Sequence, residues 1–259
     1  MTLDHSLIGM LHVPALPGTP HYQKSIPQII REVVAEAEIL KKAGFDALLV
    51  ENMHDRPYLN ASAPPEITAT LAVVAAAVKS STALPTGIQI LAAANREALA
   101  VALAANLDFV RVEGFVFAHV ADEGLIGACA ADLLRYRRQI GAEHVKIFAD
   151  IKKKHASHAI TADVDIAETA HAAEFFLADG VIITGTATGC EASLADLQAA
   201  RNATKLPTLV GSGITVDNIK SYLQFAHAVI AGSSLKHDGR WENQIDPARA
   251  HALVAAAQA

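Results

Sequence analysis

Short, almost wholly apolar runs alternate with longer alanine-rich segments from one end of the chain to the other. Brief runs of branched apolar residues are typical of parallel strands that are buried on both faces. We predict eight strands, at residues 7–10, 47–50, 87–91, 109–112, 145–149, 180–183, 208–210 and 228–230. Because strands and helices that alternate in this way form βαβ units, the pattern predicts one parallel sheet.

The longer segments between the strands have the signals of helices. We predict helices at residues 26–43, 65–80, 96–105, 130–140, 164–178, 194–203, 216–225 and 247–257. Pro27 and Pro65 suit a first helical turn, and Gly44 stands where a glycine commonly follows the end of a helix. Asn95 and Thr215 are predicted to be the N-caps of two further helices.

Eight βα units within 259 residues favour a single (β/α)8 TIM barrel of the phosphate-binding type, with residues 1–259 as one domain. An open doubly wound sheet is the alternative, but it usually has about five or six strands and leaves edges to protect. No linker rich in Pro, Gly or Ser divides the chain. The loops after the first, fourth and fifth strands are long, and long loops at this end of a barrel commonly hold its chemistry.

Composition narrows the class of protein. The net charge of -6 and the pI near 6.0 argue against a nucleic-acid partner, because such proteins concentrate Lys and Arg on one face. Two cysteines are too few for a disulfide framework and favour a reducing compartment. The N-terminus lacks the apolar core of a secretory signal, and the apolar stretch at 69–78 is about half the length of a membrane span. We therefore expect a cytoplasmic protein without a membrane span, and we predict a homo-oligomer because many barrels pair.

Polar residues follow the predicted strands at the end where a barrel gathers its chemistry. Residues at the C-terminal ends of the strands converge on one mouth, so polar side chains there would share a cavity. Each of them alone could be an ordinary loop residue or a helix cap, and the prediction therefore depends on their convergence. The candidate catalytic residues are His12, Glu51, Glu113, Asp150, Lys152 and His155.

Different chemistry is expected from the members of this set. Glu51 and Asp150 suit acid-base or metal-binding work, and Lys152 lies two residues after Asp150, so both could face the cavity. A desolvated lysine there would stabilise developing negative charge, or act as a base or as a Schiff-base nucleophile. His155 suits a proton shuttle or an anion contact, whereas Lys153 is expected in a solvated surface run.

A glycine-serine turn follows each of the last two predicted strands. Glycines at such turns let backbone N–H groups approach an anion, and serine hydroxyls add hydrogen bonds. Loops after strands seven and eight are the usual phosphate site of this fold, although two tight turns without a ligand are the simpler alternative. The predicted phosphate-binding residues of these turns are Gly211, Ser212, Gly213, Gly232, Ser233 and Ser234.

The segment at 184–189, after the sixth predicted strand, is rich in small hydrogen-bonding residues. Thr184 and Gly185 are added to the predicted phosphate-binding set, and Thr186 and Thr188 follow them. The segment suits either a third wall of the anion pocket or a mobile loop. It has neither the lysine nor the spacing of a P-loop, so ATP-motor chemistry is not predicted.

Metal dependence is left undecided by the sequence. Glu51, Glu113 and Asp150 together could bind Mg²⁺ or Mn²⁺, which would bridge to a phosphate, and His12 and His54 make Zn²⁺ conceivable. No compact motif such as HExxH or CxxC supports either metal. A GxSxG motif is also absent from the sequence, which disfavours covalent serine hydrolysis.

Seven groups of short segments are characteristic when they are taken together and in order. They are Ile8-Gly9-Met10-Leu11-His12 with Pro17-Gly18, Val50-Glu51-Asn52-Met53 with Pro57-Tyr58, Pro65-Glu66, Asp122-Glu123-Gly124, Lys154-His155-Ala156, Val210-Gly211-Ser212-Gly213-Ile214-Thr215 and Gly232-Ser233-Ser234-Leu235-Lys236. The set resembles the BtpA/SgcQ family nearly from end to end, although Glu113 stands where many relatives have asparagine. The resemblance implies a phosphate-binding TIM-type barrel. It associates cyanobacterial members with photosystem I accumulation and SgcQ-like members with sugar metabolism.

Two functions of different kinds follow from these observations. The first is an enzyme that acts on a phosphorylated sugar or nucleoside-like molecule, as a lyase, isomerase or hydrolase, by acid-base or metal-assisted chemistry at the mouth. The second is a non-enzymatic assembly or stability factor that uses the barrel as a binding surface, as the association with photosystem I biogenesis suggests. The fold by itself does not choose between them.

Overall fold

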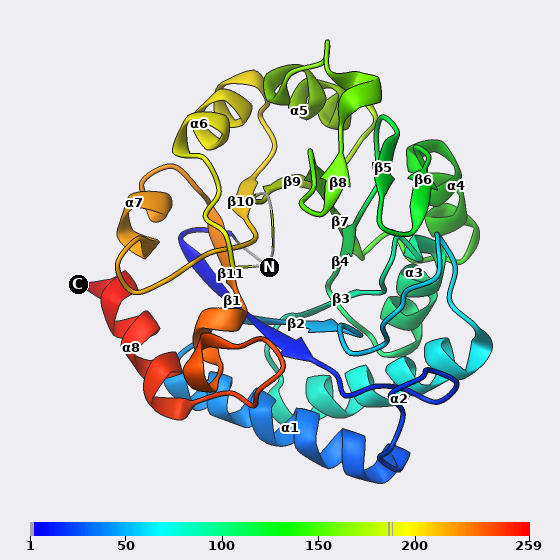
Figure 1. Cartoon of the computed structure of the whole chain (residues 1–259), viewed down its shortest axis with the longest axis vertical. Helices are drawn as coiled ribbons and strands as arrows, with labels where there is room; N and C mark the ends of the chain where they lie inside the picture. The colour runs from blue at the N-terminus through cyan, green and yellow to red at the C-terminus, as the bar shows by residue number, and fades with distance from the viewer. Residues whose placement is uncertain (1–2, 186, 188) are drawn as a thin grey trace.

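The computed structural model describes residues 3–185, 187 and 189–259 and contains a closed barrel of parallel strands with helices around it (Figure 1). The order of the strands around the barrel is β1-β11-β10-β9-β7-β4-β3-β2. The strands are β1 (Ser6–His12), β2 (Ala47–Glu51), β3 (Thr86–Gln89), β4 (Phe109–Val112), β7 (Lys146–Ile151), β9 (Gly180–Ile183), β10 (Thr208–Val210) and β11 (Ala228–Ala231). The prediction of a (β/α)8 barrel is confirmed.

A ring of helices covers the outside of the barrel (Figure 1). The helices are α1 (Ile26–Ala43), α2 (Pro65–Thr82), α3 (Asn95–Ala104), α4 (Ala130–Gln139), α5 (Ile166–Phe175), α6 (Leu194–Ala203), α7 (Ile219–Leu223) and α8 (Pro247–Gln258). Helix α7 is shorter than predicted, and the predicted N-caps Asn95 and Thr215 are wrong, because Ala94 and Asn218 occupy those positions. Among the described residues, no helix is long and apolar enough to cross a membrane.

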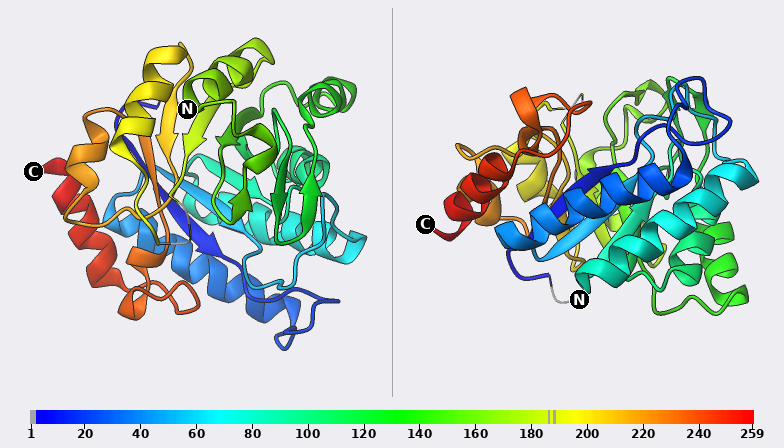
Figure 2. Two further views of the ribbon diagram at one scale, coloured as in Figure 1. Left: turned by 45° about the horizontal axis from the view of Figure 1, so that its top comes forward. Right: turned by 90° about the horizontal axis from the view of Figure 1, so that it is seen from below.

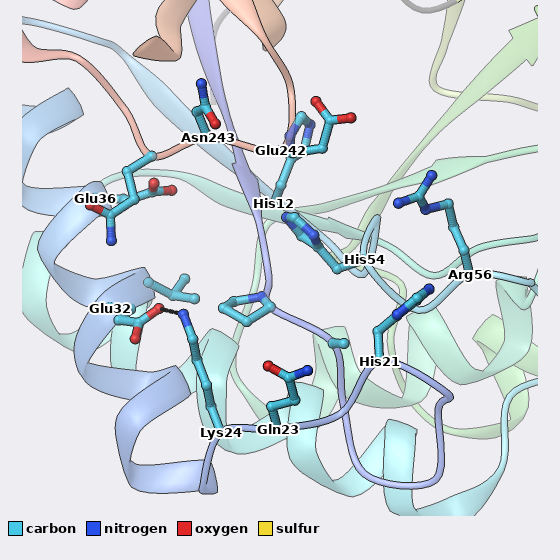
Figure 3. Close-up of a pocket in the computed structure, with 14 residues that line it drawn as sticks. His12, His21, Gln23, Lys24, Glu32, Glu36, His54, Arg56, Glu242 and Asn243 are labelled. Carbon is cyan, nitrogen blue, oxygen red and sulfur yellow. Dashed lines mark hydrogen bonds and ion pairs between the residues drawn. The ribbon is translucent and has the colours of Figure 1, made fainter.

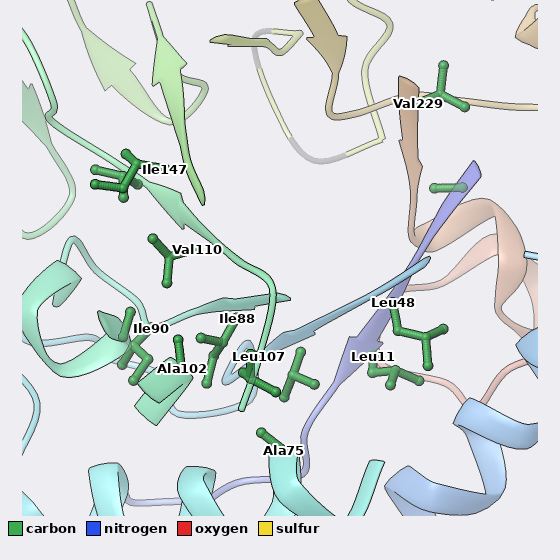
Figure 4. Packing of buried hydrophobic residues seen from close by; sticks show 14 of the residues in the cluster. Leu11, Leu48, Ala75, Ile88, Ile90, Ala102, Leu107, Val110, Ile147 and Val229 are labelled. Carbon is green, nitrogen blue, oxygen red and sulfur yellow. The ribbon is translucent and has the colours of Figure 1, made fainter. Parts of the chain in front are cut away.

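Apolar side chains alternate between the two faces of the strands. Side chains that point outward, such as Leu48 and Val110, pack against helix residues such as Ala75 (Figure 4). The inward cluster includes Phe109 and Phe148, whose ring centroids are 5.3 Å apart. The strands are thus buried on both faces, which explains why their sequences are almost continuously apolar.

Room for the Phe109 ring inside the barrel depends on a glycine in the neighbouring strand. A Cβ atom on Gly87 would lie 2.2 Å from the Phe109 ring. Such a contact is far below van der Waals distance, so a side chain at Gly87 would force the ring to move. Phe109 and Phe148 help to fill the interior of the barrel. Barrels of this kind have a packed core of side chains and not an open channel.

The register of the strands aligns polar residues at their carboxyl ends. His12 of β1 pairs with Glu51 of β2, and Glu51 pairs with Gln89 of β3. All three are the last residues of their strands, so they lie side by side at the mouth. Figure 2 shows the long loops after β1 and β11 at one end of the barrel and the N-terminus at the other.

A small antiparallel sheet, which the sequence did not reveal, lies beside the mouth. It consists of β5 (His119–Ala121), β6 (Gly124–Ile126) and β8 (Ala156–Ser157), with β5 in the centre. The β5–β6 hairpin belongs to the loop after β4, and β8 belongs to the loop after β7. Asn60 attaches the hairpin to the loop after β2, because its side-chain amide donates to the carbonyls of Glu123 and Leu125. The long loops after β4 and β7 are therefore ordered parts of the mouth.

The imidazole of His119 in β5 provides a test of this small sheet. Burial, together with the charges of Lys153 and His158, lowers the pKa of His119 to about 4, and its Nε2 atom has no partner among the described residues. The ordinary pKa of histidine is about 6.5, so between about pH 4 and pH 6.5 the unfolded chain binds more protons at this residue than the folded protein does. The free energy of unfolding therefore falls as the pH falls through this range. We expect His119→Phe to gain about 2 kcal/mol over the natural protein between pH 7 and pH 5, measured as the difference in unfolding free energy in urea. A difference that does not change with pH would contradict this.

Candidate functional site

Two adjoining cavities lie at the mouth of the barrel, where the carboxyl ends of the strands meet. One has a volume of about 250 Å³, and the other has a volume of about 280 Å³. We call the first the glycine-rich lobe, because its lining includes Gly211, Ser212, Gly213, Gly232, Ser233 and Ser234. We call the second the acidic lobe, because its lining includes Gln89, Glu113, Asp122, Glu123, Asp150 and His155. Glu51, Met53, Arg111 and Lys154 line both cavities and therefore lie where the lobes meet.

The turn after β10 is shaped to leave backbone at the surface of the glycine-rich lobe. Gly213 has a φ of +66°, and a Cβ atom there would lie 2.5 Å from the carbonyl oxygen of Cys190. A larger residue at this position would therefore strain the turn or displace the neighbouring chain. The Ser212 hydroxyl donates to the Cys190 carbonyl at 2.7 Å and accepts from the Gly185 N–H at 2.9 Å. Ser212 thus joins two loops and contributes backbone, rather than its hydroxyl proton, to the lobe.

The turn after β11 offers donors to the same lobe. Ser233 and Ser234 begin the short 3-10 helix η2 (Ser233–Leu235), and the first N–H groups of a helix have no acceptor within it. The Ser234 hydroxyl is buried and has no hydrogen-bond partner among the described residues. Arg249 of α8 also lines this lobe. The lobe therefore combines backbone and hydroxyl donors with cationic side chains.

Thr184 and Gly185, which were predicted to bind phosphate, support the mouth from behind. The Thr184 hydroxyl accepts a hydrogen bond from the Lys154 backbone N–H at 3.0 Å, and Gly185 donates to Ser212. Neither residue is among those that line the two lobes. Thr186 and Thr188 lie outside the described residues.

A buried ion pair forms the floor between the lobes. The Arg111 Nε atom donates to both oxygens of Asp150 at 3.2 and 3.0 Å, and its Nη2 atom lies 3.0 Å from Oδ2. Burial alone would lower the pKa of Arg111, but Asp150, Glu51 and Glu113 together raise it above its ordinary value. Arg111 therefore stays positively charged. The Asp150 carboxylate is held in this ion pair, whereas the sequence suggested that it would take part in acid-base or metal-binding chemistry.

A second ion pair joins Lys153 and Glu113 and corrects the prediction for Lys153. Lys153 is only 7% exposed, so the prediction that it lies in a solvated run is wrong. Its Nζ atom lies 3.1 Å from Glu113 Oε1, and the Ala93 backbone N–H donates to Glu113 Oε2 at 2.9 Å. Both oxygens of Glu113 thus have donors within the protein, so Glu113 is an anchor for the loops after β3 and β7.

Lys154, rather than Lys152, occupies the position expected of a functional lysine. The chain turns at Lys152, where φ is +49°, and the Lys152 Nζ atom donates to the carbonyl of Thr161 at 2.9 Å. Lys152 lines neither lobe, whereas Lys154 lines both. Burial and the charge of Arg111 lower the pKa of Lys154, and Glu51 partly opposes this shift. His155 follows at the exposed rim of the acidic lobe.

The pairing of His12 with Glu51 defines where a proton lies. His12 Nδ1 is 3.1 Å from the carbonyl oxygen of Trp241, and a carbonyl can only accept, so this nitrogen carries the hydrogen. His12 Nε2 then presents a lone pair toward Glu51 Oε2, 3.7 Å away. Burial lowers the pKa of His12 and raises the pKa of Glu51, although the charges of Arg111 and Lys154 oppose the shift of Glu51. The Glu51 carboxyl at the junction of the lobes therefore binds a proton more readily than an exposed carboxyl does.

The three carboxylates that the sequence offered as a possible metal site are Glu51, Glu113 and Asp150. Within the part of the chain that the structure describes, no three His, Cys, Asp or Glu side chains form a group that could hold a metal ion. The carboxylates of Asp150 and Glu113 are instead paired with Arg111 and Lys153. Glu51 has only His12 as an ion-pair partner among the described residues.

A third cavity, of about 220 Å³, lies behind His12 and is shown in Figure 3. His12 and Arg56 connect it with the mouth, because each also lines one of the two lobes. Trp241 lines the acidic lobe, and its ring packs against two side chains of the third cavity: the Arg56 guanidinium lies 4.7 Å from its centroid, and the His54 ring lies 5.0 Å away. The loop after β11 lines all three cavities, through Gly239, Trp241 and Glu242.

Sequence reasoning missed Arg111, Gln89 and Trp241 as residues of the mouth. Arg111 is a lone charge in the apolar run Phe-Val-Arg-Val, and a charge inside a buried strand is the signal that could have identified it. Gln89 ends β3, but the strand was predicted to end two residues later, at Leu91, so Gln89 was not recognised as a strand end. Trp241 lies in the loop after β11, five residues after the segment that ends at Lys236, and no predicted motif includes it.

Comparisons with known proteins place the chain among relatives that it matches nearly from end to end. The family model described as the BtpA family matches residues 3–259. The chain is 49% identical to F13E9.13 of Caenorhabditis elegans, which is named as mitochondrial, over 94% of this chain and 89% of that one. It is 35% identical to the photosystem I biogenesis protein BtpA of Synechocystis, over 96% of this chain and 87% of that one.

Solved structures support the fold at much lower identity. A thiamine phosphate pyrophosphorylase from Pyrococcus furiosus superposes with a TM-score of 0.60 at 13% identity, over 98% of this chain and 95% of that one. An N-(5'-phosphoribosyl)anthranilate isomerase from the same organism gives 0.60 at 14% identity, over 98% and 99%. These likenesses concern the barrel alone, whereas the sequence match identifies the relatives. The chain belongs to the BtpA family.

Proposed function

We propose that this protein is an enzyme that acts on a phosphorylated small molecule, a sugar phosphate or a nucleoside-like phosphate, by acid-base chemistry at the barrel mouth. The observation that carries the proposal is the position of Glu51. Its carboxyl is buried, has a raised pKa and lies where a donor-lined lobe meets an acidic lobe. Perturbed acids in a cleft with adjacent cations are typical of catalytic sites.

The glycine-rich lobe is the proposed phosphate site. The turns after β10 and β11 supply backbone N–H groups, and the Ser234 hydroxyl is buried without a partner. Lys154, Arg111 and Arg249 add positive charge, while Glu51 is the one carboxylate among the described residues that line this lobe. Because a raised pKa favours the neutral form of Glu51, the lobe favours an anion. The names of two structurally similar barrels, a thiamine phosphate pyrophosphorylase and an N-(5'-phosphoribosyl)anthranilate isomerase, also mention phosphorylated compounds.

The junction of the lobes is the proposed reaction site. Glu51 would transfer a proton to or from the carbon or oxygen that reacts, and His12 would hold the carboxyl in position. Arg111 and Lys154 would stabilise negative charge that develops on the substrate. This arrangement suits isomerisation, aldol-type cleavage or hydrolysis, and we assign to Lys154 the role that the sequence suggested for Lys152.

Location and assembly are further parts of the proposal. We propose that the protein is cytoplasmic, as the composition suggested, and that it forms homo-oligomers, as many barrels do. The name of the C. elegans relative makes mitochondria the alternative location. For the Synechocystis relative, the printed name concerns photosystem I biogenesis. An assembly role for this chain would not require the proton-transfer arrangement at Glu51.

Binding of inorganic phosphate tests the proposed ligand class directly. We expect calorimetric titration to detect phosphate binding by the natural protein, and Lys154→Met to weaken it by about 10-fold to 100-fold, because hydrogen bonds to charged groups contribute about 1.5–3 kcal/mol. Lys220→Met on α7 removes an equal charge from an exposed position and serves as the matched control. The proposal fails if the natural protein binds no phosphate, or if both variants bind it equally well.

A further inference from the structure

The acidic lobe presents two buried acceptor atoms that have no donor within the described part of the chain. Gln89 is 2% exposed, and its Oε1 atom has no hydrogen-bond partner among the described residues. Glu123 Oε2, at the tip of the β5–β6 hairpin, is likewise buried without a partner in the described part of the chain. Both residues line the acidic lobe, and they approach it from different elements. A buried polar atom without a partner costs about 1–3 kcal/mol, so two in one cavity suggest that a ligand satisfies them.

Other polar groups in the lobe already have partners within the protein. The two oxygens of Glu113 accept from Lys153 and from the Ala93 N–H, and Asp150 is held by Arg111. The Tyr58 hydroxyl donates to the carbonyl of Met53 at 2.6 Å. Gln89 Oε1 and Glu123 Oε2 are therefore two buried acceptors left for a ligand, in a lobe that cations such as Arg56 and Lys154 also line.

The two lobes thus differ in the buried groups that they offer a ligand. The glycine-rich lobe offers N–H groups, a hydroxyl and cations, which suit the anionic end of a molecule. The acidic lobe offers an amide oxygen and a carboxylate, which suit groups that donate hydrogen bonds. Since Glu51 and Lys154 line both, a molecule that spans the lobes would place its middle atoms beside the proposed proton donor.

We infer that the acidic lobe binds the hydroxyl groups of a sugar phosphate, with Gln89 and Glu123 as the residues that select them. This inference depends on the proposed function, because it assumes that the phosphate lies in the glycine-rich lobe. Hydroxyl groups fit better than an ammonium group, because cations such as Arg56, Lys153 and Lys154 already line the lobe beside its carboxylates and would repel another positive charge. The β5–β6 hairpin then contributes to substrate selection through Glu123.

The test compares two phosphate esters that differ in hydroxyl groups. Ribose 5-phosphate carries several hydroxyls, and methyl phosphate carries no sugar, so the ratio of their dissociation constants measures what the acidic lobe contributes. We expect the natural protein to bind ribose 5-phosphate at least about 10-fold more tightly. Gln89→Leu and Glu123→Ala should each reduce this ratio several-fold while leaving the affinity for inorganic phosphate unchanged. Asp163→Asn, an exposed carboxylate on another loop, is the charge control and should change neither value.

The possible outcomes separate this inference from the proposed function. Absence of phosphate binding by the natural protein would contradict the proposed function itself. Phosphate binding with equal affinity for the two esters, or a ratio that both variants leave unchanged, would overturn the selection by Gln89 and Glu123 alone. Because Gln89 is buried, its replacement by leucine could disturb folding, and an unchanged phosphate affinity of Gln89→Leu is the evidence that the mouth is still folded. Glu123→Ala on the hairpin tests the same idea independently.

Discussion

Replacing Arg111 with methionine is expected to lower the free energy of unfolding by about 3–5 kcal/mol. Asp150 is only 1% exposed at its side chain, and Arg111 is its ion-pair partner. Methionine would leave a buried carboxylate without its counter-charge, and removal of one member of such a pair is among the most destabilising changes. The loss should become smaller as the pH falls, because a lone buried carboxyl binds a proton more readily and its neutral form costs less to bury.

Urea unfolding monitored by tryptophan fluorescence and by circular dichroism measures this loss. Arg138→Met is the matched control, because Arg138 also pairs with a carboxylate, that of Glu143, but its side chain is 83% exposed. That control should change stability by less than about 0.5 kcal/mol. The double variant Arg111→Met with Asp150→Leu should recover much of the loss, since it removes both charges. Equal stability of Arg111→Met and the natural protein would show that the pair is not buried in solution.

Glu51→Gln is expected to lower kcat by about 10²-fold to 10⁴-fold for the phosphorylated substrate that a screen of sugar phosphates and nucleoside phosphates identifies. Glutamine has the shape of a protonated glutamate, but it cannot release the proton that catalysis requires. Affinity for inorganic phosphate should stay the same or rise slightly, because the substitution removes the one carboxylate of the described glycine-rich lobe. A large loss of kcat with intact phosphate binding separates a catalytic role from a structural one.

Turnover is measured by mass spectrometry of the product, with Glu168→Gln as the control, because Glu168 is an exposed carboxylate on α5. The control should retain full activity. An unchanged kcat in Glu51→Gln would remove Glu51 from the mechanism. A screen in which no phosphorylated compound is converted, although phosphate binds, would favour the non-enzymatic role instead.

The barrel could be predicted because its elements are encoded locally. The apolar runs and the helix signals repeat with the period of βα units, and strands buried on both faces allow little else. Glycine-serine turns after the last two strands also follow from position in this fold, since the seventh and eighth loops meet at the mouth. Glu51 and His12 were found for the same reason, and they pair because β1 and β2 are neighbours in register.

Contacts between distant segments could not be predicted in this way. The tripeptide Lys152-Lys153-Lys154 is a single basic run in the sequence, yet its three side chains have different surroundings. The first contacts Thr161, the second pairs with Glu113, and the third lies at the junction of the lobes. The backbone turn at Lys152, where φ is +49°, decides this distribution. Ser212 likewise seemed a phosphate ligand, but its hydroxyl is used by Gly185 and Cys190 of another loop.

The sequence by itself determined the class of fold, the end of the barrel that holds the site and the glycine-rich turns, because these depend on residue periodicity and on strand order. Tertiary structure decided which charges are paired and which atoms are left for a ligand. Arg111 neutralises Asp150 only because strands and loops far apart in the chain meet at one mouth. For the same reason, Gln89 and Glu123 each keep a buried acceptor that has no donor among the described residues. Burial and partners, which set the pKa and the unmet hydrogen bonds of each group, arise from those long-range contacts.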